Sequence, residues 1–385
     1  MSLRIGMITR HFPPGACGGQ GYHVYHLSRK LVERGHKVTV YTRKIDGQIG
    51  EEWMDRVHVK RFKCFSVPIS KGWETSLKLF FDLLKEELDL IHLHTTGLLG
   101  LTALSAAFIK RIPYFITIHD FFSVKELTSM YNLSLLKSLM LLGWQNLFYK
   151  TIINYAREVF CSEEVMEHLQ TIKIKKKPVY LPSGVDIKKF EDVNPTFRDR
   201  HRLQNKKILL CVGSICKRKS QALLISALSE LHEEFPELIC VFPSPILEAD
   251  YYDNILNMVK NQGLEDNVLF LKGVADEELI DIYKSSDVFV LPSVYEGFGI
   301  VIAEAWAAKK PVIVSDNIKI VRDKVNGLKF TTGNFFDLAK KIKMILMDKE
   351  LCERLAENGR KEVEEKYSWD MIAEKVEEHY LKTLD

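Results

Sequence analysis

The chain has 385 residues, of which 46% are apolar and 27% are charged, and its 54 Lys and Arg against 51 Asp and Glu leave a formal charge of +3. This balance is that of a globular protein and excludes the disordered and fibrous classes, and so small a net charge does not indicate nucleic-acid binding. At roughly 150 residues per domain, the length predicts two domains.

The longest apolar stretches, such as 98–109, fall short of the roughly 20 residues that span a bilayer, so we expect no membrane span. Charge appears early in the sequence, at Arg4 and Arg10, and no secretory pattern is present. The seven cysteines include no Cys-x-x-Cys pair, which excludes a zinc ribbon and gives no sign of a disulfide framework. A cytoplasmic location is therefore expected.

In the first half of the chain, short apolar strands alternate with helical patterns. A strand from Arg4 is followed by a Pro/Gly-rich loop through Gly19, a helix over 22–34 and a strand that ends at Thr42. Further strands are expected at 88–94, 114–119, 158–162 and 179–182, with a helix at 98–109. Repeated strand–helix–strand units predict a parallel sheet.

A charged stretch that is poor in apolar periodicity, 184–207, is expected to contain the linker. A second alternation comes after it, with strands at 208–213, 237–243, 268–271, 288–291 and 311–315 and helices at 222–235, 251–262, 277–286 and 301–308. The sequence thus predicts two doubly wound α/β domains in tandem. Such folds bind ligands at the carboxyl ends of their strands, so we expect the active site at the domain interface.

The glycine-rich loop at 13–21 does not carry the dinucleotide-binding fingerprint. Val24 stands where the third glycine of Gly-x-Gly-x-x-Gly would follow Gly19 and Gly21, and the second strand ends without an acidic residue. Gly18 and Gly19 would instead let backbone amides approach a phosphate or a sugar hydroxyl ahead of a helix amino terminus. The alternative is a tight turn with a packing role only.

The segment 288–305 is the most informative one. Glu296 follows an apolar strand and a turn, which places it at the carboxyl edge of the sheet, where a carboxylate can accept from sugar hydroxyls. Glu304 lies about one turn into the next helix and can accept from a ribose diol. The alternative is that Glu296 caps the helix and Glu304 pairs with a lysine.

Glycines open the backbone between these two carboxylates. Gly297 and Gly299 bracket Phe298, and a helix begins directly afterwards. The unpaired amides near Gly299, Ile300 and Val301 could therefore bind a diphosphate.

Seven motifs together resemble family 4 of the retaining glycosyltransferases, the glycosyl transferases group 1, which have the GT-B fold of two Rossmann-like domains that face a central cleft. The resemblance covers nearly the whole chain. The motifs are Phe12-Pro-Pro with Gly18-Gly19, Arg34-Gly-His-Lys-Val, Thr117-Ile-His-Asp120, Leu181-Pro-Ser-Gly-Val-Asp186, Val212-Gly213 through Lys219, Pro292 through Glu304, and Asn326-Gly327.

The resemblance implies roles for individual residues. It places Glu296 close to the transferred sugar, Glu304 on the ribose and His119 at the donor sugar near the reacting carbon, with Asp120 as a partner that orients the histidine. Lys219 would stabilise the charge that grows on the diphosphate leaving group. The alternatives are a structural His119 and a solvated basic turn at 217–219.

The sequence departs from the family pattern in three places. Ser214 stands where many members have an arginine, so Arg218 or Lys217 is expected to replace that cation. Ser183 stands in place of an asparagine, and the segment 316–327 is shorter than its counterpart and lacks a Gly-Gly-x-Pro-Glu motif. The expected catalytic residues are His119 and Glu296, and the expected donor-binding residues are Gly18, Gly19, Ser214, Arg218, Lys219, Gly297, Phe298, Gly299, Ile300, Val301 and Glu304.

No cofactor or metal is expected, because no Asp-x-Asp pair with a companion histidine sits in a strand-end loop and the family transfers sugar without a metal. The donor is expected to be a nucleotide sugar, UDP- or GDP-linked. The acceptor would be a glycan, a lipid or a small molecule. The apolar stretch 122–150, with Lys125, Lys137 and Lys150, is either a buried helix pair or a peripheral membrane contact on the inner face.

The expected domains are an acceptor-binding domain over 1–187, joined by the carboxyl-terminal helix 368–385, and a nucleotide-sugar-binding domain over 188–367. The expected activity is transfer of a hexosyl group from a nucleoside-diphosphate sugar to an acceptor hydroxyl with retention and without a metal. The alternatives are a nucleotide-sugar epimerase of the same fold and a catalytically silent nucleotide-binding scaffold.

Overall fold

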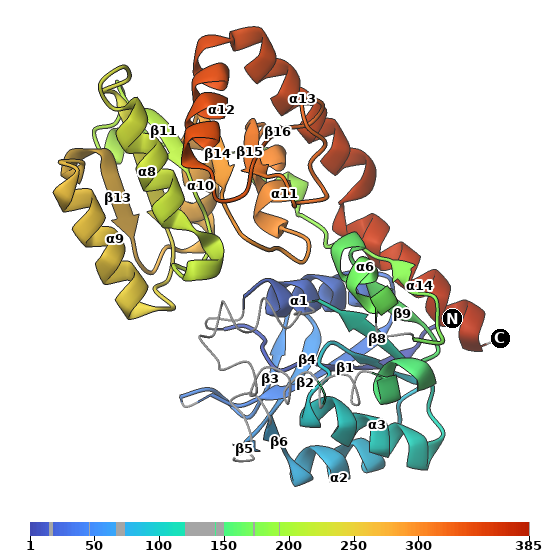
Figure 1. Cartoon of the computed structure of the whole chain (residues 1–385). Coiled ribbons are helices and arrows are strands. Elements are labelled where there is room, and N and C mark those ends of the chain that lie inside the picture. Colours follow the sequence, from blue (N-terminus) through green and yellow to red (C-terminus); the bar gives the residue numbers. More distant parts are fainter. Residues whose placement is uncertain are drawn as a thin grey trace. The chain divides into compact units, whose positions relative to one another are not determined.

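The computed structural model describes residues 1–14, 18–45, 47–66, 74–119, 143, 150–171, 174–191 and 193–384. The chain divides into two compact units, Met1–Gly184 with Trp369–Asp385 (unit 1) and Val185–Ser368 (unit 2), which Figure 1 colours along the sequence. The chain therefore passes between the units at 184/185 and 368/369, whereas the sequence analysis placed these boundaries at 187/188 and 367/368.

Unit 1 is built on an eight-stranded sheet of order β10-β9-β8-β7-β1-β2-β4-β3, in which only the β3–β4 pairing is antiparallel. Two short strands form a separate ladder. The strands are β1 (Arg4–Ile8), β2 (Lys37–Arg43), β3 (Glu51–Met54), β4 (Val57–Phe62), β7 (Leu90–Leu93), β8 (Tyr114–Ile118), β9 (Val159–Cys161) and β10 (Val179–Tyr180), with the ladder of β5 (Phe65–Ser66) and β6 (Glu74–Thr75).

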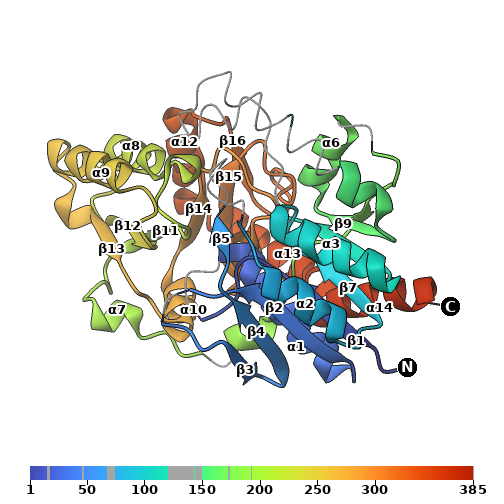
Figure 2. The ribbon, with the colours of Figure 1, turned by 90° about the horizontal axis from the view of Figure 1, so that it is seen from below.

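Helices cover both faces of this sheet. One core cluster joins α1 (Gly18–Glu33) and α14 (Trp369–Leu384) to alternate strand residues such as Leu90, and the other joins α2 (Leu77–Lys85), α3 (Leu98–Lys110) and α6 (Glu163–Thr171) to their neighbours such as Ile91. Successive strand residues point to opposite faces, so the strands of a doubly covered sheet are apolar throughout. Figure 2 shows α2 and α3 side by side.

The edge of the sheet at β3 and β4 was not assigned from the sequence. Apolar and polar residues alternate along β4 from Val57 to Lys60. Val57 and Val59 are fully buried, whereas His58 and Lys60 are half-buried. One face of this edge is thus partly solvated, which is typical of an antiparallel edge strand on an otherwise parallel sheet. The sequence analysis searched only for continuous apolar runs and therefore did not assign this strand.

Unit 2 is built on a six-stranded, all-parallel sheet of order β13-β12-β11-β14-β15-β16. Two parallel sheets in two α/β units confirm the predicted fold class. The strands are β11 (Lys207–Leu210), β12 (Leu238–Pro243), β13 (Val268–Leu271), β14 (Val288–Leu291), β15 (Val312–Ser315) and β16 (Leu328–Phe330).

Two core clusters lie on opposite faces of this sheet, one with α10, α11 and the end of α13, the other with α8, α9, α12 and the start of α13. The sequence analysis assigned no element to 316–366, where β16, α12 and α13 lie. The helices are η1 (Ile187–Phe190), α7 (Phe197–Arg200), η2 (Lys217–Lys219), α8 (Gln221–Leu231), α9 (Ala249–Asn261), η3 (Glu265–Asn267), α10 (Asp276–Ser285), α11 (Ile300–Ala307), α12 (Phe335–Met347) and α13 (Lys349–Lys366).

The stretch expected to be a linker is packed onto unit 2 instead. Phe190 and Phe197 are buried in its core, and the carboxylate of Asp281 on α10 accepts hydrogen bonds from the backbone N–H groups of Thr196 and Phe197 at 2.8 and 3.1 Å. The few apolar residues of this charged segment are therefore anchors. The linker prediction is wrong for the described residues from Val185 onward.

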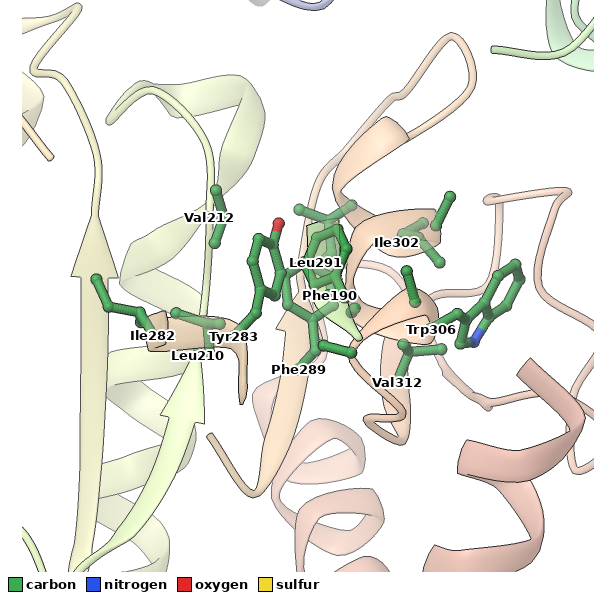
Figure 3. Close-up of a cluster of buried hydrophobic side chains, with 14 of the residues drawn as sticks. Phe190, Leu210, Val212, Ile282, Tyr283, Phe289, Leu291, Ile302, Trp306 and Val312 are labelled. Carbon is green, nitrogen blue, oxygen red and sulfur yellow. The ribbon is translucent and has the colours of Figure 1, made fainter. Parts of the chain in front are cut away.

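Trp306 on α11 lies at the centre of the contact between α11 and α13. Its ring is fully buried among the side chains shown in Figure 3, and its Nε1 donates to the carbonyl of Asn326 at 2.9 Å. Gly359 on α13 faces this ring so closely that a Cβ added to the glycine would lie 2.1 Å from Trp306 Cδ1. Only glycine fits at this crossing of the two helices.

We predict that Gly359→Ala lowers the free energy of unfolding of unit 2 by about 1–3 kcal/mol, because overpacking against Trp306 outweighs the gain in helix propensity of about 1 kcal/mol. Glu357→Ala is the control, since Glu357 is exposed on the same helix and should change stability by less than about 0.5 kcal/mol. Thermal and urea unfolding followed by circular dichroism measure both. An alanine variant as stable as the wild type would contradict the packing.

Candidate active site

The strand order of unit 2 reverses between β11 and β14, which are neighbours in the sheet although the chain first runs outward from β11 through β12 and β13. Ligands of doubly wound sheets bind beside such a switch point, at the carboxyl ends of the strands. The loop after β11 leads into η2, and the loop after β14 leads into α11. These two loops carry most of the donor-binding residues expected from the sequence.

A buried ion pair joins the two loops. Lys219 Nζ donates to Glu296 Oε1 at 2.7 Å, although 77 residues separate them, and the side chains are each only 9% exposed. Arg218 places NH1 3.3 Å from the same oxygen and donates to the carbonyl of Tyr295 at 2.9 Å. Gly213 lies under the lysine stem, where a Cβ would be 2.9 Å from Lys219 Cε.

The charge of Glu296 is fixed by these neighbours. Burial alone would raise the pKa of its carboxyl, but the positive charges of Lys219 and Arg218 outweigh burial and hold the pKa below its ordinary value of 4.5. Glu296 is therefore ionised at neutral pH and leaves a surplus of positive charge beside it.

Gly299 is the N-cap residue of helix α11 and has a φ of +78°. No side chain makes a capping hydrogen bond at this end of the helix. Ile300 and Val301 are the first two helical residues, so their N–H groups belong to the turn that has no intrahelical partners. Glu296 does not cap this helix; it pairs with Lys219. The structural alternative for Glu296 is therefore wrong.

Glu304 lies one turn further along α11. Tyr283 on α10 donates its hydroxyl to Glu304 Oε2 at 2.8 Å. Burial raises the pKa of Glu304, and the hydrogen bond from Tyr283 offsets only part of that rise. The alternative that paired Glu304 with a lysine is therefore wrong, and the partner is a tyrosine, a residue that the sequence analysis did not single out.

The remaining expected residues of unit 2 lie in the same two loops. The backbone carbonyl of Ser214 accepts from Gln221 Nε2 at 3.1 Å. Gly297 is buried, and Phe298 packs on the core with its ring edge-to-face against Tyr367, at 5.3 Å between ring centroids. Phe298 therefore anchors the loop that carries Glu296.

In unit 1, Gly18 and Gly19 are the first residues of α1 itself, not part of a loop ahead of it. Gly18 has a φ of +59°, which favours glycine, and a Cβ there would meet nothing within 4 Å. The pair is exposed. The open space and the helix terminus leave the backbone amides accessible to an anion.

His119 follows β8 and lies in a cluster of histidines. Its Nε2 is 3.0 Å from His94 Nδ1, in a loop after β7, and its ring is edge-to-face with that of His23 on α1, at 4.8 Å between centroids. Burial lowers the pKa of His119 to about 4, so the ring is neutral at neutral pH. Asp120, expected to orient it, lies outside the described residues; the described partner is His94.

Two family models match the chain. "Glycosyltransferase Family 4" matches residues 17–189, and "Glycosyl transferases group 1" matches residues 193–362. The chain belongs to this family. It is a glycosyltransferase of the GT-B fold, in the enzyme class of the hexosyltransferases.

Curated relatives match along almost their whole length. An uncharacterized glycosyltransferase of Methanocaldococcus jannaschii is 29% identical, with 97% of each chain covered. Mannosylfructose-phosphate synthase of Agrobacterium fabrum is 28% identical, with 96% of this chain and 88% of the relative covered.

Among solved structures, sucrose-phosphate synthase of Thermosynechococcus elongatus superposes with a TM-score of 0.79 and 25% identity, over 99% of this chain and 98% of the other. HepE of Anabaena, solved with UDP and glucose, gives a TM-score of 0.80 at 20% identity, over 99% of this chain and 100% of the other, which shows the shared fold.

Sequence reasoning did not single out His23 and His94, which contact His119 in unit 1, or Tyr283, which bonds to Glu304 in unit 2. One signal was present, since His92 and His94 alternate along a buried strand and its end, where polar side chains need partners. Nothing local marked Tyr283, because its partner lies on another element.

The ion pair of the glycosyltransferase predicts a pH dependence. The pKa of Glu296 is lowered in the folded state, so the pair stabilises the protein above the ordinary pKa of 4.5, and this stability is lost as the pH falls below it. Glu296→Gln leaves Lys219 buried without its counter-charge, and we expect it to destabilise by about 3–5 kcal/mol at pH 7. The melting-temperature gap between variant and wild type should narrow on acidification.

Glu304→Gln is the matched control, because its stability relative to the wild type should change with pH in the opposite direction. The pKa of Glu304 is raised in the folded state, so its ionisation costs stability as the pH rises, and the amide can still accept from Tyr283. The wild type should lose stability relative to Glu304→Gln as the pH rises above the ordinary pKa of 4.5. Parallel pH profiles for the two variants would show that the charges of the site are assigned wrongly.

Proposed function

We propose that this glycosyltransferase moves a hexosyl group from a nucleoside-diphosphate sugar, UDP- or GDP-linked, to an acceptor hydroxyl, with retention at the anomeric carbon and without a metal or other cofactor. The observation that carries the proposal is the Lys219–Glu296 pair with Arg218 beside it, at the switch point of unit 2. Retention and metal independence rest on the resemblance to family 4.

The cations of this cluster suit a diphosphate leaving group. A lysine ammonium has three donors, and Lys219 spends one on Glu296, so it can still donate to a phosphate oxygen. Arg218 supplies the second cation in place of the arginine that Ser214 replaces. The amides of Ile300 and Val301 at the start of α11 add a partial positive charge. Fixed charges and dipoles of this kind stabilise negative charge as it develops, without a metal.

The carboxylates suit the sugars of the donor. Glu296 is ionised and can accept from a hydroxyl of the transferred hexose, while Glu304, held by Tyr283 through one oxygen, can accept from the ribose. His119 of unit 1 would contact the transferred hexose, and the amino-terminal turn of α1 at Gly18 and Gly19 would contribute amides. We propose that unit 1 also binds the acceptor.

The donor and the role of Lys219 are tested together. A thermal-shift panel of UDP, GDP and ADP sugars should give a rise in melting temperature for one base, because a ligand that binds only the folded state stabilises it. Lys219→Ala should abolish this shift and lower kcat by about 10²–10³-fold, the loss typical of removing one charge-stabilising donor. Glu296→Ala should also lose transfer, and the exposed Glu357→Ala is the control that should retain it.

The product distinguishes the alternatives. Transfer with the anomeric configuration of the donor, measured by NMR in the presence of EDTA, supports a retaining, metal-independent transferase. An isomerised donor formed without an acceptor would establish an epimerase, and binding without turnover of any donor would establish a silent scaffold. Equal activity in all three variants would refute the site assignment.

We further propose a lipid acceptor reached by peripheral contact with an anionic membrane. No helix among the described residues is both long and apolar enough to cross a bilayer. Large apolar side chains nevertheless lie exposed on α2 and α3, namely Leu77, Phe81, Phe108 and Ile109 at 67%, 55%, 80% and 60%. The basic side chains Lys78, Lys85 and Arg111 lie beside them in sequence, which suits an anionic surface. Of the stretch 122–150, first considered for this contact, only residues 143 and 150 are among the described ones.

Phe81→Glu with Phe108→Glu should reduce co-sedimentation with vesicles that contain phosphatidylglycerol by about tenfold, because burial of two aromatic rings is lost and two negative charges are added. Trp53→Glu is the control, since Trp53 is 71% exposed on β3, outside these helices. Wild-type protein that stays in the supernatant, or equal losses in both variants, would refute membrane contact through this surface.

A further inference from the structure

Three imidazoles from separate elements of unit 1 meet at one point. His23 comes from α1, His94 follows β7 and His119 follows β8, and one ring nitrogen from each lies within 4.8 Å of the others. Among the described residues, they form the one group of three or more His, Cys, Asp or Glu side chains that is close enough to hold a metal ion.

A fourth histidine shows why these three differ. His92 lies 4.2 Å from His94 between ring centroids, but both of its nitrogens have partners, the hydroxyls of Tyr380 at 2.5 Å and Thr117 at 2.8 Å. The Nε2 atom of His23, in contrast, has no hydrogen-bond partner within the part of the chain that the structure describes, although the residue is only 1% exposed. A buried polar atom without a partner costs about 1–3 kcal/mol.

Neighbouring side chains orient the ring of His23 in the way that metal-binding histidines are usually oriented. Metal-binding histidines usually give their second nitrogen to another polar group, and His23 Nδ1 lies 2.8 Å from Ser183 Oγ, which leaves Nε2 for a ligand. The Trp369 ring packs edge-on against His23 at 5.2 Å between centroids.

We propose that His23, His94 and His119 bind a first-row transition-metal cation such as Zn²⁺, and that this cation inhibits sugar transfer. Two imidazoles on one tetrahedral zinc, with Zn–N bonds of about 2.0–2.1 Å, have nitrogens about 3.3 Å apart. His94 Nδ1 and His119 Nε2 are already 3.0 Å apart, so a zinc ion could replace this hydrogen bond once both rings turn to direct a lone pair at the ion. The separations among the three nitrogens, which extend to 4.8 Å, would have to shorten as the ion binds.

The cation is an inhibitor here, not a participant in the reaction. Nitrogen ligands favour Zn²⁺, Co²⁺ or Ni²⁺ over Mg²⁺ and Ca²⁺, which prefer oxygen. A metal on His119 would hold that ring away from the donor sugar. The inhibition rests on the proposed role of His119 in transfer, whereas the metal binding does not.

Metal binding is tested on the full chain by calorimetry with Zn²⁺ and by the visible spectrum with Co²⁺. The wild type should bind about one equivalent of Zn²⁺, and bound Co²⁺ should show the intense bands of a tetrahedral nitrogen site. His94→Ala should weaken zinc binding by more than about 100-fold, because loss of a ligand exceeds the 10–100-fold cost of losing a supporting group. Mg²⁺ should not bind.

Two further variants make the test independent of folding. Ser183→Ala keeps all three imidazoles and removes only the support of His23, so we expect zinc binding to weaken by about 10–100-fold. His58→Ala removes a histidine bonded to Glu51 at the edge of the sheet and should bind zinc as the wild type does. Equal zinc affinity in the wild type and the Ser183→Ala and His94→Ala variants, or octahedral Co²⁺ spectra, would overturn the site.

The transfer assay separates this inference from the proposed function. Zn²⁺ should inhibit the wild type, and EDTA should restore activity. Zinc that binds at the three histidines without inhibiting would overturn the inhibitory role and count against His119 as a donor contact. An EDTA-treated protein without transfer from any donor would refute the proposed function and leave the calorimetric result standing.

Discussion

Lys219 and Glu296 meet because β11 and β14 are adjacent in the sheet of unit 2, and the loops after both strands therefore open at the same edge. Two charged groups removed from water are tolerated only where each has close partners, and here the lysine, the arginine and the carboxylate supply them for one another. The other residues of the candidate site in unit 2 are arranged around this pair. Gly213 makes room for the lysine stem, Phe298 fixes the loop and Gly299 starts the helix.

The sequence was sufficient to predict the alternating strands and helices of the parallel sheets, because a strand buried on both faces is a continuous apolar run such as Val288–Leu291. It was also sufficient to single out Glu296, because a carboxylate after a buried strand lies at the carboxyl edge of the sheet, whereas Lys219 was singled out by the resemblance to family 4. It did not predict the bond between them. That contact depends on the order of the strands, which no local pattern encodes.

The failures have the same cause. The half-polar strand β4, the packed segment around Phe197 and the partner of Glu304 are all determined by residues far away in sequence. For His119, the adjacent Asp120 was the obvious orienting group in the sequence. Asp120 lies outside the described residues, and the described contacts of His119 come from His94 and His23, which are brought to it by β7 and α1. Neighbours in the chain were a poor guide to neighbours in the fold.

The return of α14 to unit 1 also has a consequence for the order in which the protein folds during synthesis. Unit 2 is one uninterrupted segment, so its core can close without α14, which belongs to unit 1. Unit 1 must wait, because Tyr380 bonds to His92 from 288 residues away and Trp369 packs on Gly184. Until this helix is in place, the part of the sheet face that α14 covers beside α1 stays exposed to water.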